Sequence, residues 1–198
     1  MDKSKRRVLL AAVLAVVAVP ALAQFSEGFN FLKAVRDRDG AKVTQIVSNP
    51  SSTAIHARDR ETGEGALHIL ARGRDAGWMN FLLARGARVD AQDGQGNSAL
   101  MIASQIGWTE GVDLLLSRRA NVNLPNVRGE TALIVAVQRR DIALVRMLVS
   151  RGADPDRTDS VAGYSALDYA RRDSRAAPIL RILQERRPAQ PSVGPPAR

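Results

Sequence analysis

Residues 93–103 read DGQGNSALMIA, and the three small residues Gly94, Gly96 and Ala99 lead into an apolar run. The spacing G-x-G-x-x-A is that of a dinucleotide-binding turn, where glycines let a helix N-terminus approach a pyrophosphate. Such a turn also follows a hydrophobic strand. Residues 87–92 (ARVDAQ) make a poor strand, so the glycines need another explanation.

That explanation is an internal repeat. Glycine returns after 33, 33 and 34 residues, in Gly63, Gly96, Gly129 and Gly163. An Ala-Leu pair begins three residues after each glycine, at positions 66, 99, 132 and 166. A second helix is expected to end at 86–90 (GARVD), 119–123 (RANVN) and 152–156 (GADPD), again 33 residues apart. This register predicts one repeated supersecondary unit. Gly96 is then a turn residue, and Gly94, which no other copy has, completes the G-x-G pattern by coincidence.

At these residues the chain resembles the ankyrin-repeat family, whose pattern is D-x-x-G-x-T-P-L-H-x-A followed by a second helix and G-A-D. The copies here are RETGEGALHIL, DGQGNSALMIA, NVRGETALIVA and SVAGYSALDYA. The resemblance covers residues 59–187. It implies an all-α solenoid of about five stacked helix-turn-helix repeats, joined by β-hairpin-like loops, with divergent capping repeats at both ends.

The copies depart from the family pattern at three points. The proline of the pattern is alanine in all four copies, and only His68 keeps the histidine, which in the family ties a turn together. Arg119 replaces the glycine that ends the second helix. We expect Arg119 to adopt a positive φ, at a cost of about 1 kcal/mol.

The first helix of three units has a predicted N-cap, in which a hydroxyl accepts a backbone N–H. The cap residues are Ser98, Thr131 and Ser165. Gly107 is predicted to allow the reversal between the two helices of its unit. Trp78 aligns with positions of the second helix and is predicted to lie in the core. One helical pair cannot bury its own apolar face, so stability must come from stacking of neighbouring repeats.

The sequence divides into seven predicted segments. Residues 1–23 form a signal peptide and 24–58 a divergent N-terminal capping repeat without a hairpin. Residues 59–92, 93–125 and 126–158 are three ankyrin repeats. Residues 159–187 form the C-terminal capping repeat, with its second helix starting near Pro178, and 188–198 a Pro-rich disordered tail.

The N-terminus has the pattern of a secretory signal. A basic start, an apolar run over residues 8–19 and the exit Ala21-Leu22-Ala23 predict cleavage after Ala23. The alternative is an uncleaved N-terminal anchor. The signal is interpreted as Sec-type, with the twin-arginine route as the alternative for export. The chain carries +9, of which residues 1–23 hold +3, so +6 remains after cleavage. We expect a periplasmic or secreted protein without stable membrane insertion.

The sequence contains few of the residues that commonly carry catalysis. The chain has no cysteine and two histidines, His56 and His68, so disulfides, thiolate nucleophiles and cysteine-based metal sites are excluded. The Asp residues at turns, such as Asp90 and Asp93, are interpreted as caps. The sequence predicts no enzyme, no cofactor and no metal, and a charge of +6 does not predict nucleic-acid binding.

The family resemblance implies binding of a protein partner along a concave groove, lined by hairpin tips and the C-terminal ends of the first helices. The sequence predicts a monomer whose partner is of unknown identity, with an acidic segment as one candidate for the bound element. Trp108, Arg128 and Tyr164 are the residue types that most often dominate binding energy; partial burial is the alternative for Trp108. The predicted partner-binding residues are Glu61, Thr62, Glu64, Arg72, Gln95, Asn97, Gln105, Ile106, Trp108, Arg128, Glu130, Gln138, Arg139, Tyr164 and Arg172.

Arginines also recur at or just after the ends of the first helices. They are Arg36, Arg38, Arg72, Arg74, Arg139, Arg140, Arg171 and Arg172. The preferred interpretation is that these cations offset helix dipoles, at about 0.3–1 kcal/mol each. The alternative is an arginine-rich edge that binds an acidic protein segment, an anionic envelope polymer or a membrane surface.

Overall fold

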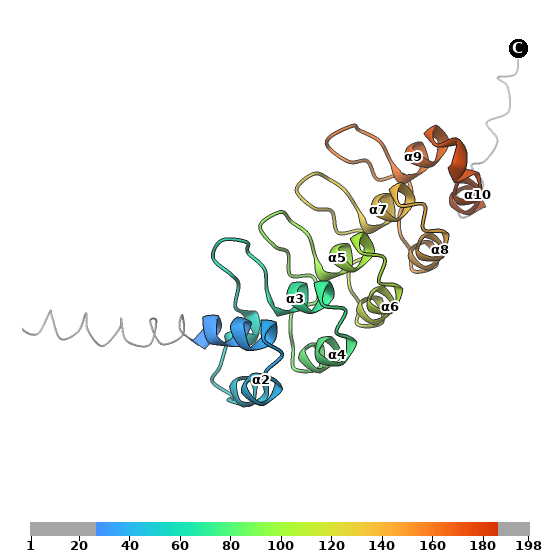
Figure 1. Cartoon of the computed structure of the whole chain (residues 1–198). Helices are drawn as coiled ribbons and strands as arrows, with labels where there is room; N and C mark the ends of the chain where they lie inside the picture. The colour runs from blue at the N-terminus through green and yellow to red at the C-terminus, as the bar shows by residue number, and fades with distance from the viewer. Residues whose placement is uncertain (1–26, 186–198) are drawn as a thin grey trace, which may run out of the picture.

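The computed structural model describes residues 27–185. These residues form a row of helical pairs, and loops project from one side of the row (Figure 1). The predicted signal peptide (1–23) and Pro-rich tail (188–198) lie outside the described residues. Within residues 27–185 no helix is long and apolar enough to cross a membrane.

Each unit contains a short inner helix, next to the loops, and an outer helix. The inner helices are residues 27–36, α3 (Ala66–Arg72), α5 (Ala99–Gln105), α7 (Ala132–Gln138) and α9 (Ala166–Arg172). The outer helices are α2 (Gly40–Val47), α4 (Ala76–Ala84), α6 (Thr109–Ser117), α8 (Ile142–Ser150) and α10 (Ala177–Glu185). Two 3-10 helices, η1 (Ala54–His56) and η2 (Ser174–Ala176), complete the described part of the chain.

The fold is the predicted all-α solenoid. Residues 27–185 contain no strand, only isolated antiparallel bridges at Gln92–Ser98 and Thr158–Ser165. Consecutive inner helices pack on one another from α3 to α9, and consecutive outer helices do so from α4 to α10. The repeated leucine of the inner helices is at most 4% exposed in all four copies, Leu67, Leu100, Leu133 and Leu167. The core is therefore one continuous apolar layer shared by neighbouring units.

The N-termini of α5, α7 and α9 are capped by the predicted residues. The hydroxyls of Ser98, Thr131 and Ser165 accept backbone N–H groups three residues ahead, at 3.2, 3.4 and 3.1 Å. Asp75 and Asp141 cap α4 and α8 in the same way. Since these bonds satisfy donors that a helix end leaves open, the units begin at fixed positions.

Left-handed backbone occurs at two kinds of position in the repeat. Arg119 has φ +64°, as predicted, where Gly86 and Gly152 have +90° and +87°. Gly107 has φ +64° at the turn between α5 and α6, which confirms its predicted role. At the same turn of other units stand arginines whose strain was not predicted from the sequence: Arg38, Arg74 and Arg140, with φ between +52° and +57°.

Trp78 lies against a glycine in the outer layer. Trp78 is half-buried, packs edge-to-face on Phe81 at 5.0 Å and lies so close to Gly40 that a Cβ there would be 2.5 Å from the ring. The core position predicted for Trp78 is thus at the edge of the core, between the first two units. The neighbouring Met79 is fully buried.

Candidate functional site

Four hairpin loops form one side of the stack, and each is organised by an Asp or Asn side chain. Their first residues, Asp59, Asp93, Asn126 and Asp159, donate a backbone N–H to a carbonyl four or five residues ahead, at 2.8–3.0 Å. The Oδ1 atom of each also accepts N–H groups from its own loop. This is the local bonding that makes Asx residues favourable in turns. The loops are therefore ordered before any partner is present.

Successive hairpins are joined tip to tip by backbone hydrogen bonds. Gly94 N–H donates to Thr62 O at 2.8 Å, Val127 N–H to Gln95 O at 3.0 Å, and Ser160 N–H to Arg128 O at 2.8 Å. The acceptor is in every case the residue before the repeated glycine. The four tips consequently form a continuous ladder, in which equivalent atoms recur every 33 residues. The four loops lie side by side in Figure 1.

The ladder explains the repeated glycine. A Cβ on Gly63, Gly96 or Gly129 would lie 2.6–2.7 Å from a backbone nitrogen of the next hairpin, and all three have φ of +70° to +75°. Gly163 has φ +68° but open space around it, because no hairpin follows. The G-x-G-x-x-A pattern at 94–99 is thus part of repeat packing, as inferred from the register.

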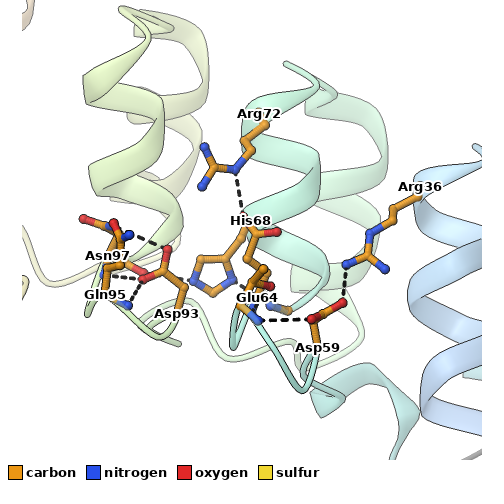
Figure 2. Close-up of polar contacts among 10 residues, drawn as sticks. Arg36, Asp59, Glu64, His68, Arg72, Asp93, Gln95 and Asn97 are labelled. Atoms are coloured by element: carbon orange, nitrogen blue, oxygen red, sulfur yellow. Dashed lines mark hydrogen bonds and ion pairs between the residues drawn. The ribbon is translucent and has the colours of Figure 1, made fainter.

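His68 ties its turn to the next hairpin (Figure 2). Its imidazole is fully buried; Nδ1 accepts the Gly65 N–H at 3.0 Å, and Nε2 lies 3.0 Å from Asn97 O. Because Nδ1 accepts, the Nε2–H is the donor to Asn97. Burial lowers the pKa of His68 below 6.5, against the opposing effect of these backbone contacts. Neither nitrogen has a lone pair left for a metal.

The hairpins and the ends of the inner helices meet in direct side-chain contacts. Arg72 Nε donates to Glu64 Oε1 at 2.8 Å (Figure 2). At the same two positions of the last unit, the Arg172 guanidinium stacks on the Tyr164 ring, 3.9 Å from its centre. These contacts define a surface that we call the hairpin face: the hairpin tips and the C-terminal ends of α3, α5, α7 and α9.

Two carboxylates in the hairpins are held in the charged form. The side chain of Arg36 donates to Asp59 at 2.7 Å, and with the N–H groups of Thr62 and Glu61 it lowers the pKa of Asp59 from 3.8 to about 2. Burial acts to raise the pKa of Asp159. The Tyr169 hydroxyl, at 2.5 Å, and three backbone N–H groups outweigh burial and keep that pKa below its ordinary value. Both carboxylates therefore work as loop anchors.

Thirteen of the fifteen residues predicted to bind a partner are exposed or half-buried, and two predictions need correction. Trp108 is only 5% exposed, because it occupies the N-cap position of α6 and its ring covers Gly111, where a Cβ would be 2.1 Å away. Asn97 is also 5% exposed, since its side chain bonds to Asp93 inside the hairpin. The remaining predicted residues are Glu61, Thr62, Glu64, Arg72, Gln95, Gln105, Ile106, Arg128, Glu130, Gln138, Arg139, Tyr164 and Arg172.

Two exposed apolar residues at the hairpin tips were not among the fifteen predicted partner-binding residues. Val127 and Val161 are 69% and 67% exposed at the tips of the third and fourth hairpins. Valine is unusual at a solvent-exposed turn, which was the available signal. Their neighbours Arg128 and Tyr164 were predicted because arginine and tyrosine are common in interfaces.

Most arginines of the predicted band already have partners. Arg36, Arg72, Arg140 and Arg171 form ion pairs with Asp59, Glu64, Asp173 and Asp168. Arg74 donates to Ile106 O in the next unit at 2.8 Å, and Arg140 likewise reaches the next unit. Arg36, Arg74 and Arg140 thus join neighbouring repeats, a role that neither interpretation from sequence included.

No group of three metal-ligating side chains occurs within residues 27–185. One hollow of this region is lined by residues around His56 and His68. His56 is exposed at the end of η1, and both nitrogens of His68 are bonded.

The comparisons with known proteins agree with this architecture. A family model described as ankyrin repeats (3 copies) matches residues 31–126 and 67–159. No curated protein matches the chain. Modules of this family generally bind other proteins and are typically non-catalytic. The matched segments span well over half of the sequence and lie within the stacked units, and the chain belongs to the ankyrin-repeat family.

Proposed function

We propose that this chain is a non-catalytic interaction module of the bacterial periplasm that binds a protein partner through the hairpin face. The proposal is supported by a separation of two sets of polar side chains, one that builds the repeat and one that is exposed at the hairpin tips. Polar groups that build the repeat, such as Ser98, His68 and Asp159, are buried and bonded. The tip residues, such as Gln95 and Arg128, are exposed on a backbone that the tip-to-tip ladder holds in place.

A preformed backbone with variable exposed side chains suits protein recognition. Binding then loses little conformational entropy, because the loops are already ordered. The proposed location rests on the composition of residues 1–23. A mature N-terminus at Gln24, measured by mass spectrometry on protein from a periplasmic fraction, is the expected result; an intact N-terminus at Met1 would refute export by cleavage.

In-cell photo-crosslinking tests the binding surface. A photoreactive amino acid is placed at Gln95 or Gln138 on the hairpin face and, as matched controls, at Arg146 or Gln184 on the outer helices; all four side chains are exposed. We expect a discrete crosslinked protein from the first pair only. The same product from the outer helices, or no crosslink from the hairpin face, would contradict the proposal.

The anionic-polymer alternative has less support. Four of the eight arginines in the band are neutralised by carboxylates of the same chain, so they present little free charge. Polymer binding would be driven by charge alone and would weaken steeply with salt.

A further inference from the structure

We propose that the partner binds at the last two hairpins, and that its binding segment is an acidic peptide with an aliphatic side chain next to its carboxylates. This inference rests on the proposed function and adds the position on the hairpin face and the chemistry of the partner. It follows from a difference between the two ends of the stack.

The apolar part of the binding surface is at the third and fourth hairpins. Val127 and Val161 are about two-thirds exposed. They flank the hydrogen bond from Ser160 N–H to Arg128 O, at 2.8 Å, so they belong to adjacent rungs of the ladder. The first two tips present Glu61, Thr62 and Gln95 instead. Exposed aliphatic side chains grouped in this way are typical of a binding site.

The cationic part is at the same end. Arg72 and Arg172 occupy the same position in their units, but Arg72 is neutralised by Glu64 at 2.8 Å. Tyr164 replaces the glutamate in the last unit, and Arg172 stacks on its ring. Among the residues that the structure describes, no carboxylate forms an ion pair with Arg172. The substitution of tyrosine for glutamate leaves a positioned guanidinium with an uncompensated charge.

Arg128 adds a second available cation between the two valines. Its side chain is 62% exposed, and its ion pair with Glu130 is long, at 3.4 Å. Carboxylates of a peptide can therefore pair with Arg128 and Arg172 while an aliphatic side chain covers the valines. At the other end, Glu61 and Glu64 make the first hairpin unfavourable for the same peptide.

The fourth hairpin also has side-chain support of its own. Tyr164 packs edge-to-face on Tyr169 at 5.6 Å, and the Tyr169 hydroxyl donates to the buried Asp159 at 2.5 Å. Asp159 accepts three N–H groups of its own loop. The platform under Arg172 is consequently fixed before binding, which favours affinity.

The test is selection from a random dodecapeptide library displayed on phage, with the purified full-length chain as target. Enriched peptides are synthesised, and their Kd is measured by fluorescence anisotropy. We expect enriched peptides to combine Asp or Glu with Leu, Ile or Val. Arg172→Gln is expected to weaken their binding about tenfold and Val161→Ser about fivefold. Arg72→Gln, the same change at the matching position, is expected to leave Kd within about twofold.

Several outcomes would overturn the inference. These are no enrichment, enriched peptides without acidic residues, or equal losses from Arg72→Gln and Arg172→Gln. If poly-glutamate binds as tightly as the enriched peptides and Val161→Ser has no effect, the site is for an anionic polymer. All three altered residues are exposed, and unchanged thermal unfolding of the variants confirms that they fold.

The photo-crosslinking experiment separates this inference from the proposed function. A partner that is captured at Gln95 but is insensitive to Arg172→Gln and Val161→Ser leaves the proposed function standing and refutes binding at the last two hairpins. Absence of any crosslinked protein from the hairpin face refutes the proposed function itself.

Discussion

Replacing Arg119 by glycine is expected to stabilise the protein. Arg119 lies two residues after α6 and has φ +64°, at the position where Gly86 and Gly152 stand in the neighbouring units. An L-residue in this region costs about 1–2 kcal/mol, and glycine loses about 0.5–1 kcal/mol more than other residues through chain entropy. The Arg119 side chain is exposed and has no hydrogen bond or ion pair to any residue in 27–185. Arg119→Gly therefore adds about 0.5–1 kcal/mol to the free energy of unfolding.

Urea unfolding measures this change as a higher midpoint at constant m-value. Arg140→Gly is the matched control, because Arg140 has φ +56° but also forms an ion pair with Asp173 in the next unit. Its strain relief is offset by the lost contact, so its midpoint is expected to rise less or to fall. A destabilised Arg119→Gly variant, or an equal gain from both variants, would refute the reasoning.

Three further predictions concern the packing and the buried histidine. Gly96→Ala is expected to destabilise the chain by about 2–3 kcal/mol, against about 1 kcal/mol for Gly163→Ala, since only the first Cβ meets a backbone nitrogen, at 2.7 Å; equal thermal shifts would contradict the ladder. Gly111→Ala is expected to cost about 1–3 kcal/mol and to red-shift the tryptophan emission, because a Cβ would lie 2.1 Å from the Trp108 ring; an unchanged spectrum would show that the ring does not need this space. His68 has a pKa lowered by burial, so the folded state binds fewer protons than the unfolded state. Its stabilising effect is complete above pH 6.5 and is lost as the pH falls through the folded pKa, by at most about 1.4 kcal/mol per pH unit; a His68→Asn variant with the same pH dependence of its urea midpoint would refute this assignment.

The fold was predictable because the period of the sequence is the period of the structure. Glycine at a fixed interval, with Ala-Leu three residues later, determined both the turn and the start of each inner helix. Ser98 and its counterparts could be assigned as caps because an N-cap depends on only a few neighbouring residues. The positive φ of Arg119 followed from alignment with Gly86 and Gly152. These features could be predicted because each depends on a few neighbouring residues that recur in every unit.

The hairpin face was predicted less well, because exposure depends on contacts between units. Tryptophan is a residue type common in interfaces. Trp108 is nevertheless buried, because Gly111 has no side chain to displace its ring. The inter-repeat role of Arg74 was equally hidden, since its acceptor, Ile106 O, lies 32 residues away. Asp75, Trp108 and Asp141 occupy the same N-cap position in successive units. The aromatic residue at a position that is otherwise aspartate was the one sign in the sequence that Trp108 has a structural role.

Consecutive hairpins are joined by a hydrogen bond between equivalent backbone atoms. Duplication of one unit in the gene, for instance residues 126–158, would give the inserted copy a complete set of neighbours on both sides. Deletion of one unit would rejoin two compatible surfaces. Evolution can therefore lengthen or shorten this protein by whole units while both capping repeats stay as they are.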